Sequence, residues 1–419
     1  MRNSILALLL LFLTAPSMAQ DHPLTLEACY KLATQNYPLI KQRELIRQTR
    51  EYSVENASRG YLPQLSFSGQ ATYQSQTIAF PFKIPGVSLP VYSKDQYKVL
   101  AEVDQTIYDG GAIRYGKDLT KAEEAIQMQN VEVDLYALKD RVNQLFFGIL
   151  LIDEQLKQNA LQTKDFKNEA EKTQASLTNG TSLRSNLDEL NAEILVTDQS
   201  RTELLASRTG YLQMLSIFVN QPLDENTAFV KPPSIIVSAA IKRPELDLFL
   251  YQEKAIDIQE LQLKSNYLPK VGAFVQGAYS RPTLNFISND FGFWALGGIR
   301  FSWSLSALYT LKNDRRLLSV NRKTIDLQKQ TFLFNTNLTL TQQNAEENKY
   351  TALLEKDQKI IGLRTSVKIA AAAQLENGVI TSHDYITEVN AESQAKQGLI
   401  LHEIQFLQSQ YNSKNTSGN

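Results

Sequence analysis

The sequence contains almost no cysteine, and the single thiol, Cys29, excludes a disulfide bond within the chain. Packing or assembly of several chains must therefore stabilise the fold. Cys29 itself is expected to be a small buried residue of the first helix. An excess of either charge is also missing, because 43 basic and 44 acidic side chains nearly cancel. A nucleic-acid-binding protein carries a basic patch or stripe, so this balance indicates that nucleic acid is not a partner.

Long apolar runs are missing after the first 19 residues. Residues 1–19 have the pattern of a secretory signal peptide: Arg2, the apolar run Ile5–Leu13, and Ser17-Met18-Ala19 before a cleavage site at Gln20. The run has nine apolar residues, whereas a helix needs roughly 20 to span a bilayer. A membrane anchor is therefore the weaker interpretation, and the sequence predicts an exported chain without transmembrane helices.

Proline is missing from two long stretches, residues 91–221 and residues 283–419. A proline inside a helix costs about 3 kcal/mol, so both stretches favour long helices. Residues 111–178 would extend about 100 Å as one helix. Apolar residues in this stretch alternate spacings of three and four, which is typical of helices wound on one another. They are Leu135, Leu138, Val142, Leu145, Ile149, Ile152 and Leu156.

An Asn-Gly pair interrupts each long stretch. Asn179-Gly180 and Asn377-Gly378 both suit the left-handed backbone conformation that ends helices, and a second apolar-periodic segment follows each pair. We therefore expect two helical hairpins, with tips at residues 179–183 and 377–381.

The sequence also repeats itself at long range, since residues 60–73 align without a gap with residues 266–279. The interval far exceeds the 20–50 residues of a solenoid unit, which predicts two similar halves, each with a short helix, a β-hairpin and a helical hairpin. The predicted segments are a signal peptide at 1–19, a first repeat at 20–220 with a β-hairpin at 64–108, a linker at 221–240, a second repeat at 241–412 with a β-hairpin at 270–304, and a flexible tail at 413–419.

Four segments alternate apolar and polar residues with a period of two, the pattern of a strand with one buried face. Strands of about 10 residues are long enough to cross a bilayer. Open sheet edges are not tolerated there, and known single-chain barrels begin at about eight strands. Several copies of the chain must therefore share one barrel, and three copies would supply twelve strands. The residues expected to face lipid are Leu65, Phe67, Tyr73, Val99, Val103, Val271, Val275, Tyr279, Phe293, Ile299, Phe301 and Trp303.

The order of these features resembles the TolC-like outer-membrane efflux protein family. The resemblance rests on the paired Tyr-Leu-Pro motifs at residues 61–63 and 267–269, on the strand-to-helix junctions at 107–111 and 301–305, and on the Asn-Gly tips. It covers essentially the whole mature chain. The fold that it implies is α+β and mainly α. In a homotrimer, four strands per chain form a twelve-stranded β-barrel, and long antiparallel coiled-coil helices form an α-barrel in the periplasm.

The function implied by the resemblance is that of a passive exit duct in the outer membrane, with most of the chain in the periplasm. Such ducts belong to tripartite efflux pumps or type I secretion systems. A periplasmic adaptor protein docks on the helical tips, and an inner-membrane RND or ABC transporter supplies the energy. The partners implied are therefore these two proteins, further copies of the chain, and outer-membrane lipid.

The resemblance also implies two groups of functional residues at the tips. The family closes its periplasmic aperture with acidic side chains after the second tip, and Asp384 occupies that position. Three-fold symmetry would make it a carboxylate ring, which favours cations. The family's next aspartate is replaced by Thr387, and the further aperture candidates are Glu388, Asp188 and Glu189; all four acids can also be read as ordinary solvated helix charges. The expected adaptor contacts are Asn179, Gly180, Thr181, Leu183, Asn377, Gly378, Val379 and Ile380.

No pattern in the sequence indicates an enzyme or a cofactor. The three histidines, His22, His383 and His402, have no metal-ligand spacing with one another or with Cys29. Two alternative functions remain open. A periplasmic adaptor would have soluble β-domains and usually one helical hairpin, and a structural coiled-coil protein would leave the strands unexplained.

Overall fold

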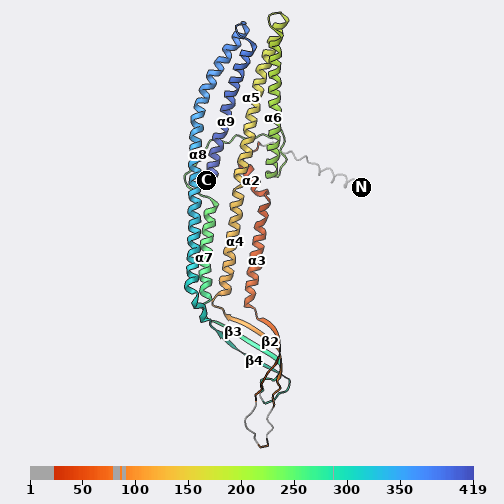
Figure 1. The fold of residues 1–419 in the computed structure, drawn as a ribbon, viewed down its shortest axis with the longest axis vertical. Helices are drawn as coiled ribbons and strands as arrows, with labels where there is room; N and C mark the ends of the chain where they lie inside the picture. The colour runs from red at the N-terminus through yellow and green to blue at the C-terminus, as the bar shows by residue number, and fades with distance from the viewer. Residues whose placement is uncertain (1–22, 79–84, 87–90, 286) are drawn as a thin grey trace, which may run out of the picture. The chain divides into compact units, whose positions relative to one another are not determined.

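The computed structural model describes residues 23–78, 85–86, 91–285 and 287–419, so the predicted signal peptide at 1–19 lies outside the described residues. The chain divides into two compact units (Figure 1). The first unit contains the residues up to Ile40, Asp134–Arg243 and Phe334–Asn419. The second unit contains Lys41–Val133 and Pro244–Leu333.

The first unit is a bundle of helices. It contains α2 (Leu26–Asn36), α5 (Leu138–Thr178), α6 (Arg184–Val219), α9 (Ser382–Ser417) and the part of α8 (Leu311–Glu376) that begins at Phe334. Helix α5 packs against α6 and α9, so the two helical hairpins lie side by side and their tips share one end of the unit (Figure 1). The expected helix at residues 111–178 is in fact two helices, because Ala137 separates α4 (Ala112–Tyr136) from α5.

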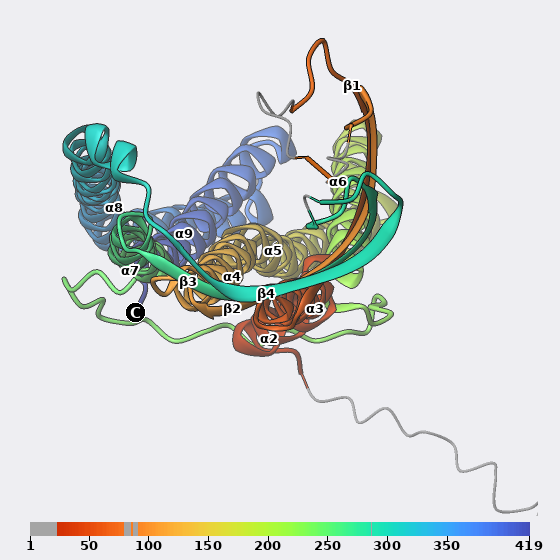
Figure 2. The same cartoon turned by 90° about the horizontal axis from the view of Figure 1, so that it is seen from below.

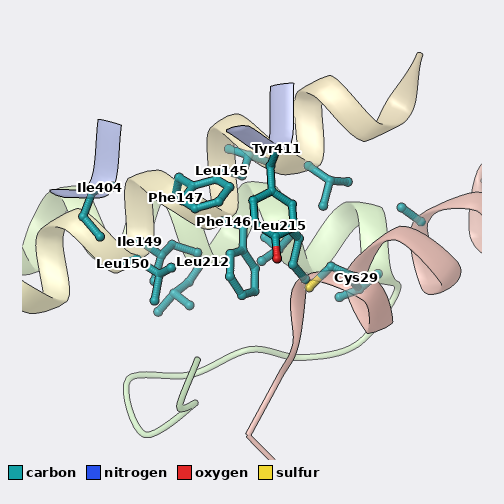
Figure 3. Packing of buried hydrophobic residues seen from close by; sticks show 14 of the residues in the cluster. Cys29, Leu145, Phe146, Phe147, Ile149, Leu150, Leu212, Leu215, Ile404 and Tyr411 are labelled. Carbon is teal, nitrogen blue, oxygen red and sulfur yellow. The ribbon is translucent and has the colours of Figure 1, made fainter. Parts of the chain in front are cut away.

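The main core of the first unit lies where α2 packs against α5 and α6, with side chains of α9 completing it (Figure 3). Phe146 and Phe147 are fully buried there, and Phe229 from the segment after α6 packs edge-on against Phe146, with ring centroids 5.5 Å apart. The predicted apolar seam supplies much of this core: its residues from Leu135 to Ile152 are all buried.

Cys29 lies within this core and is fully buried, as the sequence predicted. Burial, with a smaller contribution from Glu27, raises the pKa of the thiol to about 12. Because the thiolate is the reactive form of cysteine, Cys29 is an inert packing residue.

A second apolar cluster lies nearer the tips and joins α5, α6, α8 and α9. Phe166, Leu190 and Val389 are its most deeply buried members. A charged group, which we name the Glu392 network, links α5, α8 and α9. Lys368 Nζ lies 2.7 Å from Glu392 Oε2 and 2.9 Å from Asp165 Oδ2. The Glu392 side chain is 3% exposed and also accepts hydrogen bonds from Thr365 and Lys396.

The pKa of Glu392 reflects two opposing effects. Burial acts to raise it, but hydrogen bonds from Lys368, Thr365 and Lys396 together hold it below the usual range of a glutamate. Glu392 is therefore an ionised, fully partnered side chain in the bundle, and the network stabilises the contact between the two helical hairpins.

The prediction of a flexible tail at residues 413–419 is wrong. Helix α9 continues to Ser417, and Asn415 and Ser417 are buried. The Asn415 carbonyl accepts a hydrogen bond from the Tyr136 hydroxyl, and the Ser417 carbonyl accepts one from the Lys242 amide. The polar composition suggested disorder, but the end of α4 and the segment that precedes α7 supply partners for these groups. A polar helix end with such partners can be buried.

The second unit carries the sheet. Its helices are α3 (Gln42–Ser58), α4 up to Val133, α7 (Pro244–Ser265) and the beginning of α8. The four described strands are β1 (Gln64–Tyr73), β2 (Asp95–Tyr108), β3 (Lys270–Arg281) and β4 (Gly292–Ser302). They form one antiparallel sheet in the order β1-β2-β3-β4, so the two hairpins pair through β2 and β3. Figure 2 shows the strands as a curved band.

Asp109 fixes the passage from β2 to α4. Its carboxylate accepts hydrogen bonds from the Gly111 amide at 2.8 Å and from the Ile113 amide at 2.7 Å, which satisfies donors that a helix start would otherwise leave free. Within the described residues, no helix is both long enough and apolar enough to cross a membrane.

We predict that Lys368→Ala destabilises the first unit by about 2 kcal/mol, because it leaves a buried carboxylate with fewer partners. Guanidinium unfolding, followed by the helical circular dichroism signal, measures this loss. Lys359→Ala is the matched control, since its pair with Glu355 is exposed and its removal should cost less than about 0.5 kcal/mol.

The penalty of Lys368→Ala should also depend on pH. Since the pKa of Glu392 is held below its usual range, its stabilising effect is present above about pH 4.3, the ordinary glutamate pKa, and is lost as the pH falls through the lower folded value. The difference between Lys368→Ala and the unmodified chain should therefore shrink in acid. An equal penalty for Lys359→Ala, or no change with pH, would contradict this account.

Candidate functional site

One face of the sheet, which we name the apolar face, carries the residues predicted to meet lipid. Directly paired residues of antiparallel strands lie on the same side of a sheet. The register pairs Leu65 with Val103, and Val103 with Val275. It likewise aligns Val99 with Tyr279 and Tyr279 with Phe293. The remaining members, Phe67, Tyr73, Val271, Ile299 and Phe301, follow the same alternation.

The apolar face is largely uncovered within the described chain. Phe67 is 73% exposed, Ile299 75% and Phe293 87%. Trp303 lies just beyond β4, where its Nε1 donates to the Tyr267 carbonyl at 3.0 Å. An uncovered apolar surface of this kind marks a membrane or protein interaction site.

Sequence reasoning missed a charged pair on this same face. Arg281 forms an ion pair with Asp95 at the strand ends remote from the Tyr-Leu-Pro motifs, and its guanidinium lies 4.9 Å from the ring centroid of Phe291. Tyr279 stacks on Phe291 and contacts Phe293, with centroids 5.6 and 4.6 Å away. Aromatic rings beside a paired charge suit the boundary between lipid and water. Asp95 and Arg281 have odd numbers, as do the apolar-face residues of all four strands, and this alternation was the sequence signal that they share that face.

The opposite face, which we name the polar face, carries mainly hydroxyl, amide and charged side chains, with the apolar Leu100, Phe274, Trp294 and Leu296 among them. Arg300 on β4 reaches Glu102 at 2.6 Å and Asp104 at 2.8 Å on β2, so it passes over β3 between them. Gln276 on β3 donates to Glu102 at 3.0 Å. These contacts join three strands, and the face that they occupy is suited to water.

The sheet has two outer strands, β1 and β4, each paired on one side only within the described residues. Their free backbone groups need partners, and in a membrane no water can supply them. In a membrane, which would cover the apolar face, the sheet therefore needs further strands at both edges.

The two tips share one backbone conformation. Gly180 has φ 73° and Gly378 has φ 68°, a left-handed conformation that favours glycine. In the first tip the Thr181 amide donates to the Ser176 carbonyl at 2.9 Å, and in the second the Val379 amide donates to the Gln374 carbonyl at 2.8 Å. Both helices thus end in the motif that Asn-Gly predicts.

The predicted adaptor-contact residues differ in exposure. Leu183 and Val379 are each about 70% exposed apolar side chains, and Asn179, Gly180, Thr181, Asn377 and Gly378 are exposed beside them. Ile380 instead packs against the second apolar cluster. Leu183 and Val379 are therefore the apolar side chains that the tips offer to solvent.

Asp384 has a local role that sequence reasoning missed. Its carboxylate accepts hydrogen bonds from the Thr381 amide at 2.9 Å and the Thr381 hydroxyl at 2.7 Å, and the Asp384 amide donates back to Thr381. This is a capping box at the start of α9. The spacing Thr381-x-x-Asp384 was the signal for it. These hydrogen bonds hold the pKa of Asp384 below its usual range, with His383 adding a smaller effect in the same direction.

The other acidic candidates are placed on two helices. Glu388, one turn after Asp384 on α9, lies 3.4 Å from Arg364. Asp188 on α6 lies 3.9 Å from Arg184, and Glu189 is exposed. The described contacts do not join the α6 pair to the α9 pair within one chain. In the described part of the chain, no group of three His, Cys, Asp or Glu side chains is arranged to hold a metal ion.

Residues 29–214 match the family model described as outer membrane efflux protein. A comparison with curated protein sequences finds no match.

Solved structures are similar over nearly the whole chain. The outer membrane protein VceC from Vibrio cholerae matches with a TM-score of 0.66 at 11% identity, over 94% of this chain and 96% of that one. The Campylobacter jejuni CmeC outer membrane channel matches with a TM-score of 0.64 at 14% identity, over 94% and 85%. The open state of the Neisseria gonorrhoeae MtrE outer membrane channel matches with a TM-score of 0.62 at 11% identity, over 94% and 89%. The chain therefore has the fold of these proteins.

We predict that Thr381→Ala weakens the start of α9 by about 1 kcal/mol, because the Asp384 amide loses its acceptor. Faster hydrogen exchange at residues 382–385, with unchanged exchange at the start of α6, would show it. Thr381→Ser keeps the hydroxyl and should exchange like the unmodified chain. Equal exchange in the Ala and Ser variants would mean that the capping box does not stabilise this helix.

Proposed function

We propose, since residues 29–214 carry the outer membrane efflux protein domain, that the chain is one subunit of an outer-membrane efflux channel. The single observation that carries this proposal is the sheet, with its uncovered apolar face, its polar face and its two open edges. The channel is a passive conduit in the outer membrane, and most of its chain lies in the periplasm.

The length and pairing of the strands support a shared barrel. The strands have 10, 14, 12 and 11 residues, and about 9–11 residues suffice to cross a bilayer when tilted. The free edge of β4 in one copy needs the free edge of β1 in the next, and such head-to-tail pairing closes into a ring. Three copies give twelve strands, with the apolar face toward lipid and the polar face toward a water-filled interior.

The helical hairpins make the periplasmic part of the duct in this proposal. Two long hairpins per chain would give six in a homotrimer, which form an α-barrel. The two similar halves of the sequence then act as two similar staves of each subunit. The exposed Leu183 and Val379 suit a periplasmic adaptor protein, whose complex with an inner-membrane RND or ABC transporter supplies the energy. The assembly is the exit duct of a tripartite efflux pump or a type I secretion system.

Asp384 is the proposed constriction residue at the periplasmic end. Its role in the capping box fixes the position of the carboxylate but leaves it exposed to solvent. The lowered pKa keeps it ionised at neutral pH, so three copies would place three negative charges around the axis and favour cations. Glu388, Asp188 and Glu189 are further acids of the same aperture.

The alternative of a periplasmic adaptor explains less of the structure. A soluble protein would bury Phe67, Val275 and Ile299 against its own chain, whereas these residues are mostly uncovered. In a soluble adaptor, nothing would require strands that alternate lipid-compatible and water-compatible residues.

We predict that Val275→Arg prevents stable assembly in the outer membrane, because a cation on a lipid-facing strand costs about 2–4 kcal/mol near the midplane. Gln276→Arg is the matched control, one residue along β3 on the polar face. It should still yield membrane-inserted trimers. Membrane fractionation and cross-linking of the two variants measure the outcome. Recovery of Val275→Arg as trimers at the unmodified level would contradict the proposed orientation of the sheet.

We predict that Asp384→Asn reduces the cation preference of the channel in planar bilayers, because it removes one charge per subunit from the aperture but keeps an oxygen that can cap α9. Thr381→Ala makes the opposite change, since it removes the hydroxyl and keeps the carboxylate. It should leave the cation preference unchanged. If the two variants alter the reversal potential equally, or neither does, Asp384 acts only as a helix cap.

A further inference from the structure

Lys98 is the fourth residue of β2, near the strand ends that carry the ion pair of Arg281 with Asp95. It lies on the polar face of β2, and no carboxylate of the described chain lies within ion-pair distance of it. The neighbouring acids have other partners: Asp95 pairs with Arg281, and Glu102 and Asp104 pair with Arg300. Among the described residues, the Lys98 ammonium therefore has an aromatic ring beside it but no carboxylate.

An indole ring lies directly beside this charge. Lys98 Nζ is 5.2 Å from the ring centroid of Trp294 on β4. The register places Ser280 opposite Lys98, and Ala278 opposite both Leu100 and Trp294. The small side chains of β3 thus leave the space through which lysine and indole approach each other.

Hydrogen bonds fix the orientation of the indole. Trp294 Nε1 donates to Ser280 Oγ at 2.9 Å, and Ser280 Oγ donates to the Pro282 carbonyl at 2.7 Å. Because this chain of bonds satisfies the only polar atom of the indole, the rest of the ring is an apolar surface held in a defined position.

A cavity of 210 Å³ opens at this place. The turn after β3 contributes Leu284 to its wall, and Arg281 lines it as a second cation that is already paired with Asp95. The cavity therefore combines one cation without a carboxylate partner, apolar surface and uncharged hydrogen-bonding groups. The residues that give it this character are Gln70, Thr72, Gln96, Lys98, Leu284 and Trp294. A cavity of this size suits a small solute rather than a drug-sized one.

We infer that Lys98 and Trp294 form a binding site for a small planar aromatic carboxylate on the polar face of the sheet. The carboxylate accepts from the Lys98 ammonium, and the aromatic ring lies against Trp294 and Leu284. The inference rests on the proposed function in one respect, since the polar face lines the conduit only in a channel. There the site is a transient stop for an anionic solute, which must bind weakly enough to leave.

Binding is tested without any need for conduction. The chain has two tryptophans, Trp294 and Trp303, so Trp303→Phe leaves Trp294 as the only indole reporter. The probe is 4-nitrobenzoate, a planar aromatic carboxylate that quenches indole fluorescence, added to the assembled protein in detergent. We expect saturable quenching. Lys98→Gln in the same background should weaken the apparent affinity about tenfold, because one charge-assisted contact is lost.

Lys270→Gln is the matched control, because Lys270 is a second cation on the polar face of β3 and lies outside this cavity. It should leave the affinity for 4-nitrobenzoate unchanged, and the neutral analogue 4-nitrobenzamide should quench without saturation. Equal weakening by Lys98→Gln and Lys270→Gln would overturn the inference in favour of a general charge effect. Saturable binding of the amide with the affinity of the carboxylate would overturn it as well.

Channel recordings separate this inference from the proposed function. In planar bilayers 4-nitrobenzoate should reduce the current of the unmodified channel, and Lys98→Gln or Trp294→Ala should require about tenfold more of it. Absence of any current would contradict the proposed channel while the fluorescence result still decides on the site. Normal current with equal block in the unmodified, Lys98→Gln and Trp294→Ala channels would overturn the site and leave the channel intact.

Discussion

The apolar face of the sheet has no cover within the described chain, and most of the proposed architecture is a consequence of that fact. Phe67, Phe293 and Ile299 stand on one side of four strands whose outer edges are unpaired. In water such a surface would cause non-specific aggregation of the chains. Lipid removes the cost of the apolar side chains but forbids free backbone groups. Further copies of the chain satisfy both conditions, because β1 and β4 can pair with their neighbours.

The first unit, the helical bundle, is held together by apolar packing and by a small group of charged contacts. Val142, Leu145 and Ile149 of the seam form an ordinary apolar core with Phe146, Phe147 and Phe229. Glu392, Lys368 and Asp165 instead connect the hairpins through charged contacts. A buried ion pair contributes little net stability compared with apolar packing, yet losing one partner is costly. The Glu392 network therefore constrains how α5, α8 and α9 align. At the tip, Asp384 also has two roles: its carboxylate caps helix α9, and its charge stays exposed to solvent.

The two faces of the sheet separate two kinds of contact within one strand. Odd-numbered residues such as Val275 suit lipid, and even-numbered neighbours such as Gln276 suit water. Exceptions to the alternation carry information. Asp95 and Arg281 are a charged pair on the apolar face, placed where aromatic rings gather at the strand ends. The polar face carries some apolar side chains as well, among them Trp294, whose Nε1 is satisfied by Ser280. The proposed Lys98–Trp294 site lies at this second exception.

The sequence alone determined the elements that depend on local periodicity and turn chemistry. Period-two alternation located the strands and their apolar side, heptad spacing located the seam from Leu135 to Ile152, and Asn-Gly located both tips, because these signals arise from backbone geometry that neighbouring residues impose. Tertiary structure decided what depends on partners distant in the chain. The polar composition of residues 413–419 predicted a flexible tail. In the structure, Tyr136 and Lys242 donate hydrogen bonds to the carbonyls of Asn415 and Ser417 and hold this segment in place. Likewise, only the pairing of β2, β3 and β4 placed Lys98 beside Trp294 and Arg300 beside Glu102 and Asp104. Spacing along one strand cannot reveal these contacts, since they are set by the register between strands.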